Sequence, residues 1–347
     1  MGISSGLGSS ALLPAGLGFR NVIINGGFDV WQRGTTATIP NTRATSYLAD
    51  RWSAYRDTAG STQSRVAAGL DGFRYAMRVQ RNSGNTDQSN GIFVTQSFET
   101  SEMVKLAGKR VALSFYARAG ANWSATASRL RGTLQAGSGT EANMMYDGIN
   151  NGIYAVNVPI YINVGLTTSW QLFTLTGLIP SGSNGGGVEF EWLPQGTPAG
   201  AADYFEITGV QLEANTQSTP FEQRPYGTEL ALCQRYYETS YISPHAAGTA
   251  TTLGIHLGSG TAASRTTGEI RDSHQFMVEK RATPSVTLYS NTGQINTVTR
   301  ADYGIAYNGN RTGSVTDPSR KSFGVYSGDS GAHGSALLFH FVAEAEL

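Results

Sequence analysis

Cysteine, net charge and long apolar runs are all scarce in this chain of 347 residues. Its one cysteine, Cys233, excludes an intramolecular disulfide framework and a thiolate-rich metal cluster, and folding in a reducing compartment is expected. No stretch reaches the roughly 18 apolar residues that span a bilayer, and residues 1–20 lack the basic start of a secretion signal, so neither membrane insertion nor such export is expected. The 25 basic and 25 acidic residues cancel to a net charge of +0, which excludes the long-range attraction that draws basic proteins to nucleic acid.

Glycine, by contrast, is abundant: 43 glycines and only 14% charged residues favour many short strands joined by turns over long helices. Apolar and polar side chains alternate along residues 72–81, where Phe73, Tyr75, Met77 and Val79 share one face of a predicted strand. Strands are predicted on the same grounds over residues 21–31, 91–98, 109–118, 154–164, 170–179, 187–192 and 204–213. This spacing predicts an all-β fold built around an antiparallel β-sandwich.

The strand predicted over residues 204–213 changes phase in the middle. Phe205 and Ile207 fall on one face, whereas Val210 and Leu212 fall on the other. We predict a β-bulge near Gly209, because an extra residue there resets the alternation and brings all four apolar side chains to the same side.

One helix signal interrupts the strands. Thr228 is the predicted N-cap, and Cys233 and Tyr237 follow at spacings typical of one helix face, so a short helix is predicted over residues 228–240. More strand patterns follow, and the last, over residues 336–347, is apolar on both faces, as in a strand that lies centrally in a sheet or packs against another subunit. We therefore predict three parts: a tail over residues 1–20, a β domain over 21–224, and the helix with a second, smaller β domain over 225–347.

The tail is too rich in glycine for a helix and too small-sided for a core of its own. It nevertheless carries more apolar groups than a solvated linker needs, so we expect it either to fray or to become ordered by docking on another surface. The docking candidates are Ile3, Leu7, Leu12, Leu13, Leu17 and Phe19.

Aromatic side chains are the main candidates for ligand contact, because an exposed ring can stack on the apolar C–H face of a sugar. Trp31, Trp52 and Trp170 lie within strand patterns and are predicted to be core residues. Four other aromatics lie in or beside polar, loop-like stretches and are expected to be accessible: Trp123, Trp192, Tyr146 and Tyr154.

No catalytic or zinc-binding constellation stands out in the sequence. The five histidines are not spaced as ligands on one element, so a zinc site is not expected. Carboxylates such as Asp57, Asp71, Glu141 and Asp147 are not singled out by any pattern as the pair that glycoside cleavage needs. No enzymatic activity is expected.

Several ordered motifs between residues 21 and 237 resemble one kind of protein. They are NVIINGGFDVWQRG at 21–34, ADRW at 49–52, VALSFYAR at 111–118, VQLE at 210–213, STPFEQRPY at 218–226 and ELALCQRYY at 229–237. Together they resemble structural proteins of tailed bacteriophages, of the tail-fibre, head-fibre or decoration type. The resemblance implies a virion protein that is assembled in the host bacterial cytoplasm, joins other proteins of the capsid or tail, and forms a homotrimer.

The order of NGGFDVW near the start and FEITGVQLE near the end also resembles the jelly-roll of family 4/9-type carbohydrate-binding modules. That resemblance implies a jelly-roll over residues 21–224. In those modules, acids of the first and last strands often hold a structural calcium. Asp29 matches the first-strand acid, whereas Thr208 and Gly209 stand where the modules usually have aspartates. Asp29 is therefore the one candidate metal ligand, and no cofactor is expected.

Three hypotheses of function follow. The first is a non-enzymatic virion protein, a fibre or fibre-like component, that docks on the particle by its N-terminus and contacts polysaccharide of the host surface. The second is a capsid decoration protein or tail adaptor with no ligand. The third is a glycan depolymerase, which requires two carboxylates facing each other in an aromatic-lined groove.

Overall fold

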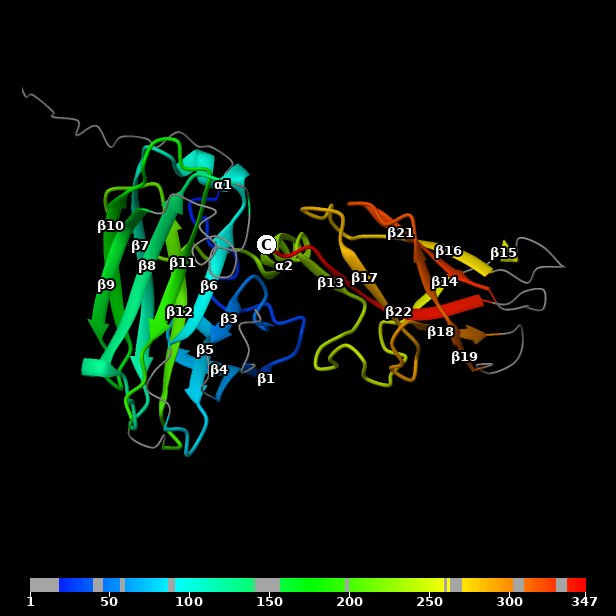
Figure 1. Ribbon diagram of the computed structural model, residues 1–347, viewed down its shortest axis with the longest axis horizontal. Coiled ribbons are helices and arrows are strands. Elements are labelled where there is room, and N and C mark those ends of the chain that lie inside the picture. The colour runs from blue at the N-terminus through cyan, green and yellow to red at the C-terminus, as the bar shows by residue number, and fades with distance from the viewer. Residues whose placement is uncertain are drawn as a thin grey trace, which may run out of the picture.

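The computed structural model describes residues 19–39, 46–56, 60–86, 91–139, 141, 157–196, 200–258, 261–262, 270–301, 309–328 and 336–347. Strands dominate these residues, and all strand pairs are antiparallel, so the predicted all-β class is confirmed. Figure 1 shows a large β-sandwich and a smaller β unit on either side of helix α2 (Tyr226–Gln234).

The sandwich consists of two six-stranded sheets with jelly-roll order. The first sheet runs β1 (Thr36–Ile39), β4 (Ser61–Leu70), β5 (Phe73–Arg81), β12 (Tyr204–Glu213), β7 (Arg110–Ala119) and β10 (Gln171–Leu178). The second sheet runs β2 (Ser46–Tyr47), β3 (Ser53–Arg56), β6 (Ile92–Phe98), β11 (Gly185–Trp192), β8 (Arg129–Gly137) and β9 (Asn157–Gly165). β4 and β5 form a hairpin, but β5 beside β12 in the first sheet and β6 beside β11 in the second come from distant parts of the sequence, so both sheets also depend on long-range pairing.

The inward side chains of the two sheets form one apolar core. In β11, Val188, Phe190 and Trp192 all point into it, because alternate residues of a strand share a face. Trp31 and Trp52 are buried in the same core, which confirms their predicted role. The alternation of β11 therefore leaves its intervening residues on the outer face of the second sheet.

Residues 21–31, all within the described part of the chain, form a turn-rich loop rather than the predicted strand. The loop makes two backbone hydrogen bonds with β12, from the Val22 N–H to the Leu212 carbonyl at 2.8 Å and from the Val210 N–H to the Gly26 carbonyl at 3.0 Å, and it is also held by the Asn25 side chain. Asn25 accepts a hydrogen bond from the Val30 N–H at 3.0 Å and donates to the Val30 and Asp50 carbonyls. Asn25 and Phe28 also adopt positive φ angles of 57° and 55°, which end extended structure.

The β-bulge predicted in β12 is confirmed. The register of β12 against β7 shifts between Thr208 and Gln211, and Gly209 has a φ of 63°. As a result, Phe205 and Val210, on opposite sides of the shift, are both fully buried in the core.

The predicted helix exists with different bounds. Helix α2 starts at Tyr226 after Pro225, so Thr228 is not the N-cap, and it ends at Gln234. Residues Tyr237–Thr239 form strand β13 instead of the last helical turn, because they pair with β22. A second short helix, α1 (Thr100–Leu106), and a 3-10 turn (Thr126–Ser128) were not predicted. Neither α-helix in the described ranges has the length or apolar character to cross a membrane.

The smaller unit is built around the strand β22 (Ala336–Glu344), which is buried on both faces. It pairs with β13 and with β14 (His256–Gly258), β17 (Ser285–Tyr289) and β18 (Thr297–Ala301), and β18 pairs with β19 (Asn310–Thr312). A four-stranded sheet runs β15 (Thr261–Ala262), β16 (Ile270–Gln275), β21 (Ser322–Ser327) and β20 (Ser314–Thr316). Of the two alternatives for the terminal strand, the central position is therefore confirmed. The apolar cores draw on residues 23–212 and 270–343, while the exact domain boundaries stay a prediction.

A buried ion network joins the two β units beside α2. The carboxylate of Glu346 accepts hydrogen bonds from Arg33, at 3.1 Å, and from Arg51. The Arg33 guanidinium lies 3.6 Å from the ring centroid of Tyr237, and that of Arg51 lies 3.5 Å from the ring of Tyr236. Charge pairing and cation–π contact thus hold the end of the smaller unit against the sandwich.

Candidate functional site

The outer face of the second sheet carries polar and aromatic side chains, and we call it the polar face. Its members are Ser53 and Tyr55 of β3, Phe93, Thr95 and Ser97 of β6, Glu189 and Glu191 of β11, Arg131, Thr133 and Gln135 of β8, and Tyr161 and Asn163 of β9. They share this face because each stands one residue away from an inward, apolar neighbour on its strand.

The strand register arranges these side chains in rows across the sheet. Glu189 stands opposite Thr95 of β6 and Thr133 of β8, and Thr133 in turn stands opposite Tyr161 of β9. Such opposed side chains have Cβ atoms about 5 Å apart, close enough to contact one ligand together. A linear molecule lying across the strands would meet four side chains in this row alone.

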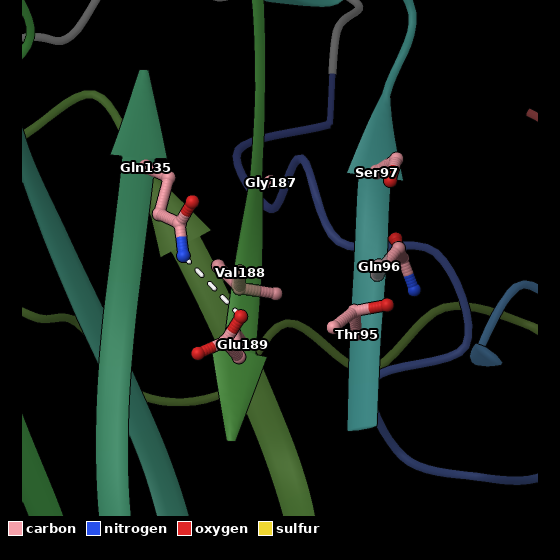
Figure 2. Close-up of a pocket in the computed structure, with 7 residues that line it drawn as sticks. All are labelled: Thr95, Gln96, Ser97, Gln135, Gly187, Val188 and Glu189. Atoms are coloured by element: carbon pink, nitrogen blue, oxygen red, sulfur yellow. Dashed lines mark hydrogen bonds between the residues drawn. The ribbon is translucent and has the colours of Figure 1, made fainter. Parts of the chain in front are cut away.

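Two hollows open on this part of the sheet. The first, a small one, is lined by residues 95–97 of β6, residues 187–189 of β11 and Gln135, as Figure 2 shows. The second is larger and is lined by residues that include Arg131, Asn163 and Glu191. The two hollows lie against consecutive outward residues of β11, so they belong to one continuous stretch of the polar face.

Glu189 is a buried carboxylate with no ion-pair partner among the described residues. It is 7% exposed, and no basic side chain in the described ranges forms an ion pair with it. Its only hydrogen bond among the described residues is a long one, 3.3 Å, from the Gln135 amide nitrogen. Burial, and then repulsion from the Glu191 carboxylate, raise the pKa of Glu189 to about 7.

Glu191 has the partner that Glu189 lacks. Arg131 donates a hydrogen bond to its carboxylate, and burial raises the pKa of Glu191 while Arg131 opposes the rise. The Arg131 guanidinium also lies 5.4 Å from the ring centroid of Tyr161. Tyr161 itself is 57% exposed, which makes its ring the accessible aromatic surface of the polar face.

Three polar atoms of β8 on this face have no hydrogen-bond partner in the described part of the chain: Thr133 Oγ1, Gln135 Oε1 and Arg131 Nε. Thr133 is 4% exposed and Gln135 is 8% exposed, so bulk water reaches them poorly. A buried polar group left unpaired costs about 1–3 kcal/mol. Three such groups clustered around Glu189 are the pattern of a surface that completes its hydrogen bonds with a ligand.

The structure corrects the aromatic platform predicted from the sequence. Trp192 is fully buried, because it shares the inward face of β11 with Phe190, and Trp123 stacks on it with ring centroids 4.6 Å apart. The accessibility predicted for Trp192 is therefore wrong, and Trp123 is partly buried against the core. Tyr146 and Tyr154 lie outside the described residues.

Trp170, predicted to be core, is also placed differently. It is only partly buried and lies on the first sheet's side of the sandwich, where its indole N–H donates to the Ala68 carbonyl at 2.9 Å. The Arg118 guanidinium lies 4.7 Å from its ring centroid. Trp170 thus belongs to a cation–π contact at the surface rather than to the apolar core.

The polar face was not predicted from the sequence, although the alternation of apolar residues in β11 indicates it. Alternation along residues 187–192 sets Glu189 and Glu191 opposite the apolar side chains, and this could have identified two acids on one strand face. Residues 129–137, which form β8, were not recognised as a strand at all. Without β8, neither Thr133 nor Gln135 could be placed beside the two acids.

Other predicted site residues are dispersed or only partly described. Phe19 is exposed and contacts the Arg224 guanidinium, whereas Ile3, Leu7, Leu12, Leu13 and Leu17 lie outside the described residues. Glu141 pairs with Arg281 and Asp71 is exposed, while Asp57 and Asp147 fall in undescribed segments. None of these carboxylates that can be placed faces a second one across a groove in the described structure.

The candidate metal ligand Asp29 has no companions in the described ranges. No three His, Cys, Asp or Glu side chains there converge as a metal site would require. Burial, followed by repulsion from Glu229, raises the pKa of Asp29. Thr208, at the place of a last-strand acid in the resembled modules, donates its hydroxyl to the Tyr75 carbonyl at 2.9 Å.

No protein-family model matches the chain, and no curated protein sequence matches it. Among solved structures, a xylan-binding domain of carbohydrate-binding module family 22 is 15% identical, covering 54% of this chain and 98% of its own, with a TM-score of 0.33. A structure described as a family 4 carbohydrate-binding module is 16% identical, covering 55% of this chain and 98% of its own, with a TM-score of 0.31. The enzymatically active domain of bacteriophage CBA120 tailspike protein 4 is 12% identical over 56% of this chain, with a TM-score of 0.32, and this chain covers 22% of its length. At these scores the similarities carry no argument about the ligand or the activity of this chain.

Proposed function

We propose that this protein binds polysaccharide through its polar face and does not cleave it. The observation that carries the proposal is the cluster of buried, unpaired polar atoms around Glu189, beside the exposed ring of Tyr161. Sugars offer the two things this surface lacks: hydroxyl groups that complete hydrogen bonds, and C–H faces that pack on an aromatic ring. A chain of sugars lying across the strands would use both along its length.

Binding rather than cleavage is favoured by the direction of the two acids. Glu189 and Glu191 project from the same side of one strand, two residues and about 6.6 Å of strand apart. Glycoside hydrolysis needs two carboxyl groups that flank the scissile bond. Arg131 already donates a hydrogen bond to Glu191, so only Glu189 of the two acids lacks a charged hydrogen-bond partner among the described residues. A glycan depolymerase is the alternative function.

We further propose a setting for this binding: a virion, assembled in a host bacterial cytoplasm, in which residues 1–20 dock the protein on the particle. The support is the resemblance of residues 21–237 to structural proteins of tailed phages. Weak sugar sites suit such a particle, because many copies act together and avidity replaces tight single contacts. A decoration protein or tail adaptor with no ligand is the alternative within the same setting.

Self-association, proposed as a homotrimer, is supported by the edges of the sandwich. Strands β9 and β10 are the outer strands of their sheets, and neither contains a charged residue. Besides Tyr161 on the polar face, their exposed large hydrophobic side chains are Val158, Leu172 and Leu178. Long edge strands without charge are usually covered, because they otherwise pair with other chains.

The binding proposal is tested with the full chain and a panel of soluble bacterial surface polysaccharides, by affinity electrophoresis and by product analysis. We expect retardation by at least one polysaccharide with no shortening of its chains. The variant Gln135→Ala should weaken the retardation, whereas Gln80→Ala, on the first sheet, should not. Retardation that survives in Gln135→Ala would contradict the site, and shortened chains would establish the depolymerase instead.

The association proposal has a separate test. Light scattering after gel filtration should show a trimer for the wild type and a smaller species for Leu178→Lys, which places a charge on the β10 edge. Val104→Lys is the matched control, since Val104 on α1 is 52% exposed and Leu178 is 55% exposed. A wild-type monomer would contradict the proposal, as would a Leu178→Lys trimer.

A further inference from the structure

We propose that the polar face selects uncharged polysaccharides and rejects acidic ones, with Glu189 as the residue that makes the selection. This inference rests on the proposed function, since it names the class of ligand for the same site. It starts from the charges that a ligand would meet. Those on the described part of this stretch are Glu189, Glu191, Arg131 and, at the start of β8, Arg129.

These charges do not cancel evenly along the face. Arg131 is committed to Glu191 by a direct hydrogen bond, and Arg129 is exposed at the far end of its strand. The hollow beside Glu189 has no basic side chain among its lining residues, and the other six lining residues, drawn in Figure 2, are all neutral. An anionic ligand group at this hollow would therefore meet the negative charge of Glu189 in a poorly hydrated place, since Arg131 acts on Glu189 only from a distance while it donates its hydrogen bond to Glu191.

Hydrogen bonding selects in the same direction. The free groups beside the hollow are mainly acceptors: the Glu189 carboxylate and the unpaired Gln135 Oε1. A sugar hydroxyl donates to such oxygens, whereas a uronate carboxylate brings only acceptors. An acidic sugar would thus lose hydrogen bonds as well as suffer repulsion. Discrimination of this kind depends on a repulsive element as much as on an attractive one.

The test compares polysaccharides that differ only in charge. Alginate, polygalacturonate and hyaluronate are each prepared as the acidic polymer and as its carboxyl-reduced form, in which every uronate has become a primary alcohol. The panel also holds the surface polysaccharide for which the wild type shows retardation, together with its carboxyl-reduced form if it is acidic. Binding of the full chain is measured by affinity electrophoresis at pH 8 and fixed ionic strength, with Glu189→Gln as the test variant and Glu102→Gln, an exposed acid on α1, as the control.

We expect the wild type and Glu102→Gln to bind a carboxyl-reduced or naturally neutral polymer at least about tenfold more tightly than acidic counterparts. Glu189→Gln keeps the shape of the side chain and removes the charge, so it should gain affinity for the acidic polymer. The ratio of the affinity for the neutral polymer to that for the acidic polymer should therefore fall severalfold. Equal or tighter wild-type binding to acidic polymers would overturn the inference while leaving polysaccharide binding in place, and an unchanged ratio in Glu189→Gln would do the same. Failure to bind any polymer would instead overturn the proposed function, and this inference would fall with it.

Discussion

The two outer faces of the sandwich each carry a buried glutamate, and the surroundings of these two acids differ. On the first sheet, Glu206 of β12 is fully buried and accepts hydrogen bonds from Arg78 Nε at 2.8 Å and from Arg118 Nε at 2.6 Å. Each arginine also lies over an aromatic ring, Arg78 over Tyr204 and Arg118 over Trp170. On the second sheet, Glu189 has one long hydrogen bond and no cation among the described residues.

This contrast separates an acid whose partners are complete from an acid that, under the proposed function, is available to a ligand. Around Glu206 the charges and hydrogen bonds are completed within the protein. That face therefore gains stability and keeps few unpaired polar groups for a ligand. Around Glu189 the carboxylate and its neighbours Thr133 and Gln135 keep free acceptors at a cost in stability. Burial of an acid is therefore a poor indicator of function by itself, and the state of its partners decides between the two roles.

The largest expected effect comes from breaking the completed network. Glu206→Ala should lower the free energy of unfolding by about 3 kcal/mol, because it leaves two arginines without their shared carboxylate. Glu189→Gln should change it by less than about 1 kcal/mol or raise it, since a buried charge without a partner is removed. Urea denaturation followed by tryptophan fluorescence measures both. A loss in Glu189→Gln as large as that in Glu206→Ala would abolish the distinction between the faces.

The pH dependence of stability gives the next effect. The pKa of Glu189 is about 7 in the folded protein against a usual value of 4.5, so the folded state binds the extra proton between these pH values. Its favourable contribution is complete below about pH 4.5 and is lost as the pH rises through 7. From about pH 5 to pH 8, the wild type should therefore lose about 2–3 kcal/mol more unfolding free energy than Glu189→Gln. Parallel curves for the two proteins would show that Glu189 is paired in solution.

A smaller effect is expected on affinity when the exposed ring is removed. Tyr161→Ala should weaken polysaccharide binding by about 1 kcal/mol, or roughly fivefold, because one stacking surface beside Arg131 is lost. Tyr204→Ala removes the equivalent ring over Arg78 on the first sheet and should leave affinity unchanged. Calorimetric titration of both variants compares the faces directly, and equal losses would move the ligand away from the polar face.

The smallest effects should have opposite signs for two buried threonines. Thr133→Val removes an unpaired hydroxyl and should raise the free energy of unfolding by about 0.5 kcal/mol. Thr208→Val removes a hydroxyl that donates to the Tyr75 carbonyl and should lower it by about 1 kcal/mol. Thermal denaturation of the two isosteric variants is sufficient. Destabilisation by Thr133→Val would mean that its hydroxyl has a partner in the free protein.

Alternation of apolar residues predicted much of the sandwich, including the bulge at Gly209. That pattern is local, because the apolar positions of a strand are the ones that face the core. It failed for β8, in which the inward positions include Gly132. This glycine removes an apolar side chain from the alternation, although a Cβ there would make only ordinary contacts, 3.6 Å from Ile162 and 3.7 Å from Phe115. It failed over residues 21–31 because Asn25 and Phe28 adopt positive φ angles that end extended structure, although the segment keeps two backbone hydrogen bonds to β12.

The candidate site was less predictable than the fold. Which acid keeps a free carboxylate depends on strand register and on distant arginines, and Glu206 and Glu189 look alike in the sequence. The accessibility of Trp192 could have been judged better, since it has the same phase as Phe190 in one strand. The difference between Glu206 and Glu189 could not have been predicted from the sequence, because the hydrogen-bond partners of each glutamate lie more than 50 residues away.

The buried ion network at Glu346 can form only late in the synthesis of the chain. Its two arginine partners lie 313 and 295 residues away in the sequence. During synthesis the sandwich must therefore wait, with Arg33 and Arg51 lacking this carboxylate, until almost every residue of the sequence has left the ribosome. Contacts of such long separation form late and slowly, because the intervening chain must first be closed into a loop. A ribosome that stalls within the smaller unit would leave Arg33 and Arg51 without Glu346, so this contact between the two units could not form.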